Sequence, residues 1–167
     1  ILDILRAMSG DIDVLNLRQA GAEPVADIRV RASRLRGIAV PAELVPLAID
    51  EFPAIAVAAA CAQGETLITG AQELRVKESD RIAAIAAGLA ALGVAVEALP
   101  DGLRIQGGRL HGGVVESHGD HRIAMAFSLA ALRADALVQI RDCVNVGTSF
   151  PGYVELMRGL GLAIEAA

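Results

Sequence analysis

Apolar residues along the chain predict two helices that are hydrophobic on nearly every side. The first falls within the longest uninterrupted apolar run, Phe52 to Ala62, and the second begins near Arg122 in "RIAMAFSLAAL". A helix without a polar face has to be buried on all sides. The run from Phe52 is also too short to cross a bilayer. We therefore expect both helices in the core of a globular domain.

A third helix is predicted to be amphipathic. It follows the charged stretch "RVKESDR", and its apolar side chains recur at Ile82, Ile85, Ala86, Leu89 and Leu92. This spacing places them on one helical face. We expect this helix to cover the outside of the core.

The two apolar helices belong to an internal repeat. When Ile49–Thr69 is aligned without gaps on Gly119–Gln139, Asp50 falls on Asp120, and three alanines and one leucine also coincide. Each block contains an acidic loop, an apolar helix, a polar turn and a strand. The repeat predicts that the two helices are buried and roughly parallel.

Two shorter pieces also recur. One is a helix end, a glycine stop at Gly10, Gly93 or Gly161, and an alternating strand. The other has the pattern of a β-hairpin and covers residues 28–40 and 103–115. We treat the glycine pairs of the second hairpin as turns, because no strand leads from them into a helix as a dinucleotide-binding loop requires.

These pieces predict an α/β fold built from repeated units of strand, helix, strand, helix and hairpin. The unit is complete once, from about Asp50 through the Gly107–Gly108 pair, and is cut short on both sides. The expected architecture has buried helices enclosed by mixed sheets, within a single domain over residues 1–167. The chain opens with "ILDILRAMSG", the pattern of a helix already in progress, so we expect it to be part of a longer protein.

Composition narrows the function. The formal net charge of −5 and an aromatic content of 2% argue against nucleic-acid binding. Cys61 and Cys143 lack the spacing of a redox or zinc motif, which favours a reducing cytoplasm. We expect a cytoplasmic protein without a membrane segment.

Charged residues gather where the predicted helices begin. Capping by Ser79 or Asp80 explains some of them, because acidic and hydroxyl side chains accept hydrogen bonds from the first helical N–H groups. It does not explain the cations, which are unfavourable at a helix start unless they face an anion. Two readings stay open for Lys77, Arg81 and Arg122: ordinary salt bridges, or one anion-binding pocket formed by several loops.

The residues of these loops suggest two further kinds of chemistry, metal binding and proton transfer. His118 and His121 lie three residues apart beside one aspartate, which is a weak metal signal without a third ligand, and we expect no metal. Asp50 and Glu78 are candidate acid/base groups. Arginines nearby should favour the charged form of both carboxylates.

Four stretches together resemble the EPSP synthase (3-phosphoshikimate 1-carboxyvinyltransferase) family. They are "IDEFPAIAVAAA", "LRVKESDRIAAIAAGLAALG", "SHGDHRIAMAFSLAAL" and "NVGTSFPGYVELMRGLG". The resemblance covers essentially the whole chain in the right order. It implies a C-terminal part of the enzyme, in which two domains of repeated βαβαββ units enclose the active site.

The resemblance implies transfer of the enolpyruvyl group of phosphoenolpyruvate to the 5-hydroxyl of shikimate 3-phosphate, without metal or organic cofactor. It also implies a monomeric parent protein whose N-terminal domain is absent here. By their matching positions, Asp50 would be the proton acceptor, Glu78 the second acid/base residue and Lys77 a ligand of shikimate 3-phosphate. Arg81 and Arg122 would bind phosphoenolpyruvate, and His121 would lie beside its phosphate.

One residue departs from the common family pattern. Many members have a lysine before the Phe-Pro pair that contacts phosphoenolpyruvate, and this chain has Thr148 there, as a subgroup of the family does. Two alternatives stay open. One is the related transferase acting on UDP-N-acetylglucosamine, whose pattern lacks "KESDR". The other is a non-catalytic anion-binding domain.

Overall fold

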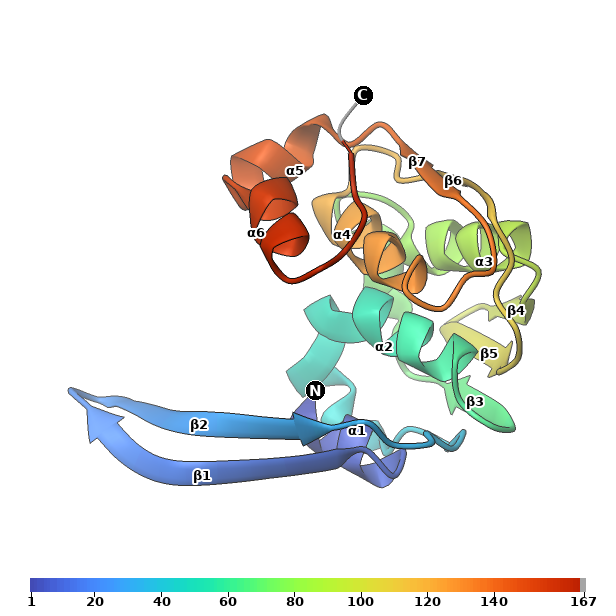
Figure 1. Ribbon diagram of the computed structural model, residues 1–167. Helices are drawn as coiled ribbons and strands as arrows, with labels where there is room; N and C mark the ends of the chain where they lie inside the picture. Colours follow the sequence, from blue (N-terminus) through green and yellow to red (C-terminus); the bar gives the residue numbers. More distant parts are fainter. Residues whose placement is uncertain (166–167) are drawn as a thin grey trace.

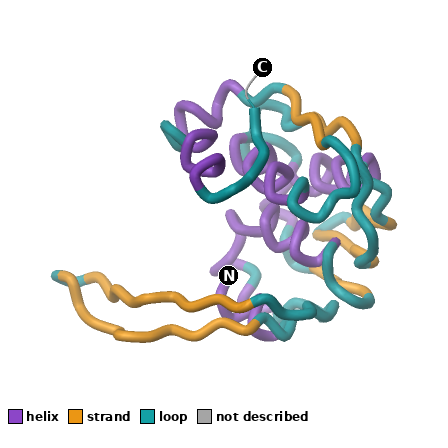
Figure 2. Tube along the Cα trace, viewed as in Figure 1, coloured by secondary structure: helices purple, strands orange, loops and turns teal. Residues whose placement is uncertain are grey.

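The computed structural model describes residues 1–165 and has three small sheets, two of which lie beside the central helices (Figure 1). One sheet pairs β1 (Asp11–Ala20) with β2 (Glu23–Arg31). The second has the order β3 (Glu65–Ile68), β5 (Gly102–Gln106), β4 (Ala95–Leu99), and the third pairs β6 (Gly113–Glu116) with β7 (Val138–Arg141). Figure 2 shows the helices gathered in the body of the molecule, while the β1-β2 hairpin extends away from it. The predicted α/β class, with repeated units of helices and strands, is confirmed.

The complete βαβαββ unit lies in the middle of the chain. Its first strand is a short segment in which Arg36 and Ala39 pair in parallel with Gln63 and Leu67. The following elements are α2 (Phe52–Ala60), β3 (Glu65–Ile68), α3 (Arg81–Ala91), β4 (Ala95–Leu99) and β5 (Gly102–Gln106). Three short 3-10 helices lie between them: η1 (Ala42–Leu44), η2 (Pro46–Glu51) and η3 (Gln72–Val76).

Partial units flank the complete one. The first comprises α1 (Leu2–Ala7), β1 (Asp11–Ala20) and β2 (Glu23–Arg31). The last comprises β6 (Gly113–Glu116), α4 (His121–Ala130), β7 (Val138–Arg141), α5 (Val144–Ser149) and α6 (Tyr153–Gly159). One face of the β1-β2 hairpin carries cross-strand apolar pairs, such as Val14 with Ile28, and Ile28 is 55% exposed.

The two inner helices are buried, as their composition predicts. Seven residues of α2 are buried, and α4 buries six, including Phe127. The helices pack against each other and begin close together, since the side chain of Arg122 reaches the backbone oxygen of Asp50. The amphipathic helix α3 buries Ile82, Ile85 and Leu89 against this core.

The ungapped repeat holds at the helices and fails at the strands. It aligns Leu67 with Leu137, but Leu67 lies in β3 whereas Leu137 precedes β7 and is 83% exposed. The loop after α4 contains additional turn residues, and β7 starts only at Val138. The two aligned blocks therefore share their helices, but their backbones differ from the end of the helices onward.

Both predicted hairpins are wrong. β5 pairs with β3 and β4, whereas β6 pairs in parallel with β7, so residues 103–115 pass from one sheet to another. Residues 28–40 likewise leave β2 and run to the segment beside β3. A strand, a polar turn and a second strand fit both a hairpin and a crossing between sheets, and long-range pairing decides between them.

The glycine stops are confirmed in two of the three places. Gly93 and Gly161 have left-handed backbone angles, with φ of 81° and 94°. After α1 the left-handed residue is Ser9, with φ of 69°, one residue before Gly10. The strand expected after Gly161 is not formed in residues 162–165, and the rest of it lies outside the described residues.

A glycine lets α3 approach α4. A Cβ atom at Gly88 would lie 2.4 Å from Cζ of the buried Phe127 ring. Gly88→Ala is expected to lower the free energy of unfolding by about 1–3 kcal/mol, because overpacking in a tight core outweighs the gain in helix propensity. Urea denaturation measures this change. Gly159→Ala in α6 is the control, since its Cβ meets no atom within 4 Å, and no loss is expected there.

Within residues 1–165, no helix has both the length and the hydropathy needed to span a bilayer.

Candidate functional site

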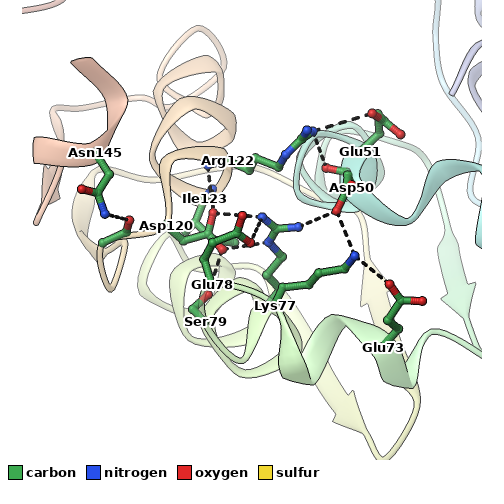
Figure 3. Close-up of polar contacts among 12 residues, drawn as sticks. Asp50, Glu51, Glu73, Lys77, Glu78, Ser79, Asp120, Arg122, Ile123 and Asn145 are labelled. Atoms are coloured by element: carbon green, nitrogen blue, oxygen red, sulfur yellow. Dashed lines mark hydrogen bonds and ion pairs between the residues drawn. The ribbon is translucent and has the colours of Figure 1, made fainter. Parts of the chain in front are cut away.

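Three separate segments of the chain meet at the N-terminal ends of α2, α3 and α4 (Figure 3). Asp50 lies in η2, just before α2. Lys77 and Glu78 lie in the loop between η3 and α3, and Arg81 is the first residue of α3. Asp120 precedes α4. The segments are far apart in sequence and are joined here by ion pairs.

Arg81 is the centre of this cluster and is completely buried. Its Nε donates a hydrogen bond to Asp120 Oδ2 at 2.8 Å, and Nη2 donates to Asp120 Oδ1 at 3.3 Å. On its other edge, Nη1 donates to Asp50 Oδ1 at 3.0 Å and Nη2 to Glu78 Oε2 at 2.6 Å. One guanidinium is thus shared by three carboxylates from three segments.

Asp120 is also completely buried, and it connects more groups than any other member described here. Besides Arg81, it accepts hydrogen bonds from the Ser79 hydroxyl at 3.0 Å and from the backbone N–H groups of Arg122 and Ile123. It therefore caps α4 and fixes the loop before α3 at the same time.

Lys77 and Arg122 complete the cluster on its solvent side. Lys77 Nζ lies 2.7 Å from Glu73 Oε1 and 3.3 Å from Asp50 Oδ1. Arg122 Nη1 donates to the backbone oxygen of Asp50 at 3.0 Å and lies 3.7 Å from Glu51 Oε1. Figure 3 shows these side chains converging from separate segments of the chain.

A second arginine holds the loop that carries Lys77 and Glu78. Arg75 donates to the backbone oxygens of Leu99 and Pro100 and to the carboxylate of Asp80 at 2.7 Å. Asp80 in turn accepts from the backbone N–H of Ala83 and caps α3. The loop is therefore anchored both to the β4-β5 turn and to its own helix.

The charges of the cluster tune its carboxyl groups. Partial burial tends to raise the pKa of Asp50, but the hydrogen bond and charge of Lys77, with Arg81 and Arg122, outweigh it and the pKa is lowered. Burial likewise opposes ionisation of Asp120, and Arg81, the Arg122 N–H and Ser79 still lower its pKa. Both groups are carboxylates at neutral pH.

The lowered pKa of Asp120 makes stability depend on acid pH. A carboxyl whose pKa is lower in the folded state stabilises that state above its ordinary value of 3.8, and this stabilisation is lost as pH falls through the folded pKa. The free energy of unfolding of the parent should therefore exceed that of Asp120→Asn at pH 6, and the difference should shrink below pH 3.8. Urea titrations at several pH values measure it. A difference that stays constant with pH would contradict the assignment.

The structure brings five of the six predicted site residues into one connected network: Asp50, Lys77, Glu78, Arg81 and Arg122. The sixth, His121, is the partly buried first residue of α4, and it makes no side-chain hydrogen bond or ion pair within the described part of the chain. These contacts support both hypotheses for Lys77, Arg81 and Arg122. The three cations form salt bridges, and they also converge on one place, as an anion-binding pocket requires.

Sequence reasoning missed the role of Asp120 as the buried partner of Arg81. Its alignment with Asp50 in the repeat was the available signal, but the two aspartates differ, because Asp120 caps its helix and Asp50 does not. Of the two predicted caps of α3, Asp80 is confirmed, whereas Ser79 points to Asp120 instead. Among residues 1–165 no group of side chains has the composition and geometry of a metal site.

An apolar groove of about 280 Å³ adjoins the cluster. Asp50, Glu51 and Arg122 form its charged end. Its apolar lining comes from α2, α4, α6 and the residue directly after α5, and includes Pro53, Met125, Leu129, Phe150, Tyr153 and Met157. Thr148, at the usual lysine position, is exposed on α5, and Asn145 of the same helix donates to the backbone oxygen of Gly119.

Known proteins match this chain over most or all of its length. A sequence profile described as EPSP synthase (3-phosphoshikimate 1-carboxyvinyltransferase) matches residues 1–157. A 3-phosphoshikimate 1-carboxyvinyltransferase of Halorhodospira halophila is 64% identical over 99% of the chain, and one of Methylococcus capsulatus is 60% identical over all of it. The chain spans 37% and 38% of the lengths of these two relatives.

The fold of the chain is also similar to that of EPSP synthase. A solved structure of EPSP synthase from Acinetobacter baumannii superimposes with a TM-score of 0.95 and 50% sequence identity. The match covers 98% of this chain and 39% of that protein. The chain belongs to the EPSP synthase (3-phosphoshikimate 1-carboxyvinyltransferase) family.

Proposed function

We propose that this chain forms one side of an active site that transfers the enolpyruvyl group of phosphoenolpyruvate to the 5-hydroxyl of shikimate 3-phosphate, releasing phosphate. The observation that carries this proposal is the convergence of the five family-motif residues where three helices begin. Two anionic substrates require cations, and addition followed by elimination requires proton transfer. The cluster contains both kinds of group.

Each residue has a role in this reaction. Lys77 binds shikimate 3-phosphate, and Arg81 and Arg122 bind phosphoenolpyruvate, with His121 beside its phosphate. Asp50 accepts the proton of the attacking hydroxyl, and Glu78 handles the proton of the methylene group. The reaction needs neither metal nor organic cofactor.

The electrostatics of Asp50 suit a proton acceptor in one respect. Its lowered pKa keeps it ionised at neutral pH, as a base must be. The same ion pairs make it a weaker base, because a carboxylate stabilised by cations gains less from accepting a proton. Catalysis therefore requires that these ion pairs loosen when substrates bind.

The remaining part of the protein supplies the other side of the site. The chain spans less than two fifths of the relatives' length, and its three cations are matched by five carboxylates in direct contact with them: Asp50, Glu51, Glu73, Glu78 and Asp120. Additional cations are needed to hold two substrate anions. We place them in a second, N-terminal domain of a monomeric cytoplasmic enzyme.

The first test compares the chain with the longer protein that contains it. With both substrates, the longer protein should release phosphate and the chain alone should not, because effective molarity is lost when half of the site is missing. The chain alone should bind inorganic phosphate with a Kd of about 1 mM or weaker, with NMR shifts gathered at residues 77–81 and 120–122. Turnover by the chain alone would contradict a site shared with another domain. An inactive longer protein that still binds phosphate here would favour a non-catalytic anion-binding domain.

A further inference from the structure

The hydrogen bonds of Arg81 divide its guanidinium into an inner and an outer edge. A guanidinium has five N–H donors and binds a carboxylate or phosphate best through two of them on one edge. The inner edge, Nε and Nη2, faces both oxygens of Asp120. The outer edge, Nη1 and Nη2, faces Asp50 and Glu78. Both edges are therefore occupied by carboxylates, and a ligand can bind either edge in a bidentate way only by displacing them.

The two edges differ in their access to water. Arg81 and Asp120 are both fully buried, and separating a buried pair leaves an uncompensated charge, which is strongly unfavourable. The side chains of Asp50 and Glu78 are 42% and 51% exposed. In these two pairs water reaches the carboxylate, which can therefore leave the guanidinium at a lower cost than the buried Asp120 can. An incoming anion can therefore compete for the outer edge and not for the inner one.

We propose that Arg81 works as an ion-pair exchange centre: an anionic substrate takes the outer edge of its guanidinium, and Asp50 and Glu78 are released from it while Asp120 stays bound. The inference rests on the proposed function, in which Arg81 binds phosphoenolpyruvate and the two released carboxylates transfer protons. No covalent bond changes in this step, since only hydrogen bonds and ion pairs are exchanged.

The exchange links substrate binding to proton transfer. Before binding, Arg81 pairs with both acid/base residues; afterwards, the substrate neutralises Arg81 and these carboxylates lose a cationic partner. For Asp50, whose pKa the cations beside it lower, basicity rises as a result. Asp50 is released only in part, because its carboxylate keeps the ion pair with Lys77. Arg122 also stays near, since it donates a hydrogen bond to the backbone oxygen of Asp50. Glu78 has no other ion pair within the described residues, so its release is the larger change.

The test measures anion affinity after one competitor has been neutralised. In the full-length protein that carries this chain, Glu78→Gln should tighten binding of inorganic phosphate and of phosphoenolpyruvate by about two- to fivefold, the size expected from losing an exposed ion pair. The control is Glu97→Gln, which removes the same charge from an ion pair outside the cluster, between Glu97 of β4 and Arg104 of β5, where Glu97 is 62% exposed. Its affinity should equal that of the parent.

Carbon-13 and nitrogen-15 NMR distinguish exchange from simple addition. With selective labels, the carboxyl resonances of Glu78 and Asp50 and the guanidinium resonances of Arg81 should move along the phosphate titration, while that of Asp120 stays fixed. If the Arg81 signals move but affinity is equal in all three proteins and the Glu78 signal is constant, the exchange is wrong and the anion site stands. If phosphate and phosphoenolpyruvate leave Arg81 unaffected, the exchange and its proposed role as a ligand both fail.

Discussion

Asp120→Ala is expected to destabilise the protein by about 3–5 kcal/mol, the cost of leaving a buried charge without its partner. The substitution leaves the buried guanidinium of Arg81 without its inner partner. It also removes the acceptor for the first N–H groups of α4 and for the Ser79 hydroxyl. Urea denaturation followed by circular dichroism measures the change.

Asp50→Ala is the matched control for this prediction. It removes a carboxylate from the same arginine, but one whose side chain is 42% exposed. Its loss should be about 1 kcal/mol or less, because water replaces an exposed partner. If Asp50→Ala and Asp120→Ala lower the free energy of unfolding equally, burial does not make the Asp120 ion pair stronger than the Asp50 ion pair.

Asp50→Asn and Glu78→Gln are each expected to lower turnover by the longer protein by about 10²–10⁴, the usual contribution of a positioned acid or base. Both replacements keep the shape of the side chain and remove its ability to transfer a proton. Steady-state kinetics with both substrates measures kcat and KM separately. For Glu78→Gln the proposed exchange at Arg81 predicts a second effect: the protein should bind anions more tightly although its turnover falls.

Glu73→Gln is the control for these two variants. Glu73 also belongs to the charged cluster, but within residues 1–165 its one ion pair is with Lys77, and its side chain is 61% exposed. Neutralising it should leave kcat within about a factor of ten, because it has no proton to transfer. Near-normal turnover in Asp50→Asn or Glu78→Gln would remove that residue from the proton-transfer steps.

Local patterns were sufficient for the inner helices. The apolar stretches now seen as α2 and α4 have no polar face, so burial follows from the hydrophobic effect whatever surrounds them. The amphipathic face of α3 and the cap at Asp80 were equally predictable, because both depend on residues within a few positions of each other. The family motifs marked the residues of the candidate site for the same reason: they are short and contiguous.

Pairings between distant segments were not predictable in this way. Residues 28–40 and 103–115 have the local pattern of hairpins, and only the parallel pairing of β6 with β7, and of the segment near Ala39 with β3, shows that the chain crosses between sheets. The free energy that decides such pairings comes from contacts far apart in sequence. An alternating pattern is the same for either partner.

The sequence by itself determined which charged residues stand before which helices, because helix periodicity and capping are local properties. Only the tertiary structure decided that Arg81 turns one edge to a buried Asp120 and the other to two exposed carboxylates. Burial depends on how α2, α3 and α4 pack together, and the strength of an ion pair depends on burial. The same three carboxylates therefore divide into one structural anchor and two exchangeable partners, a distinction that spacing along the chain does not contain.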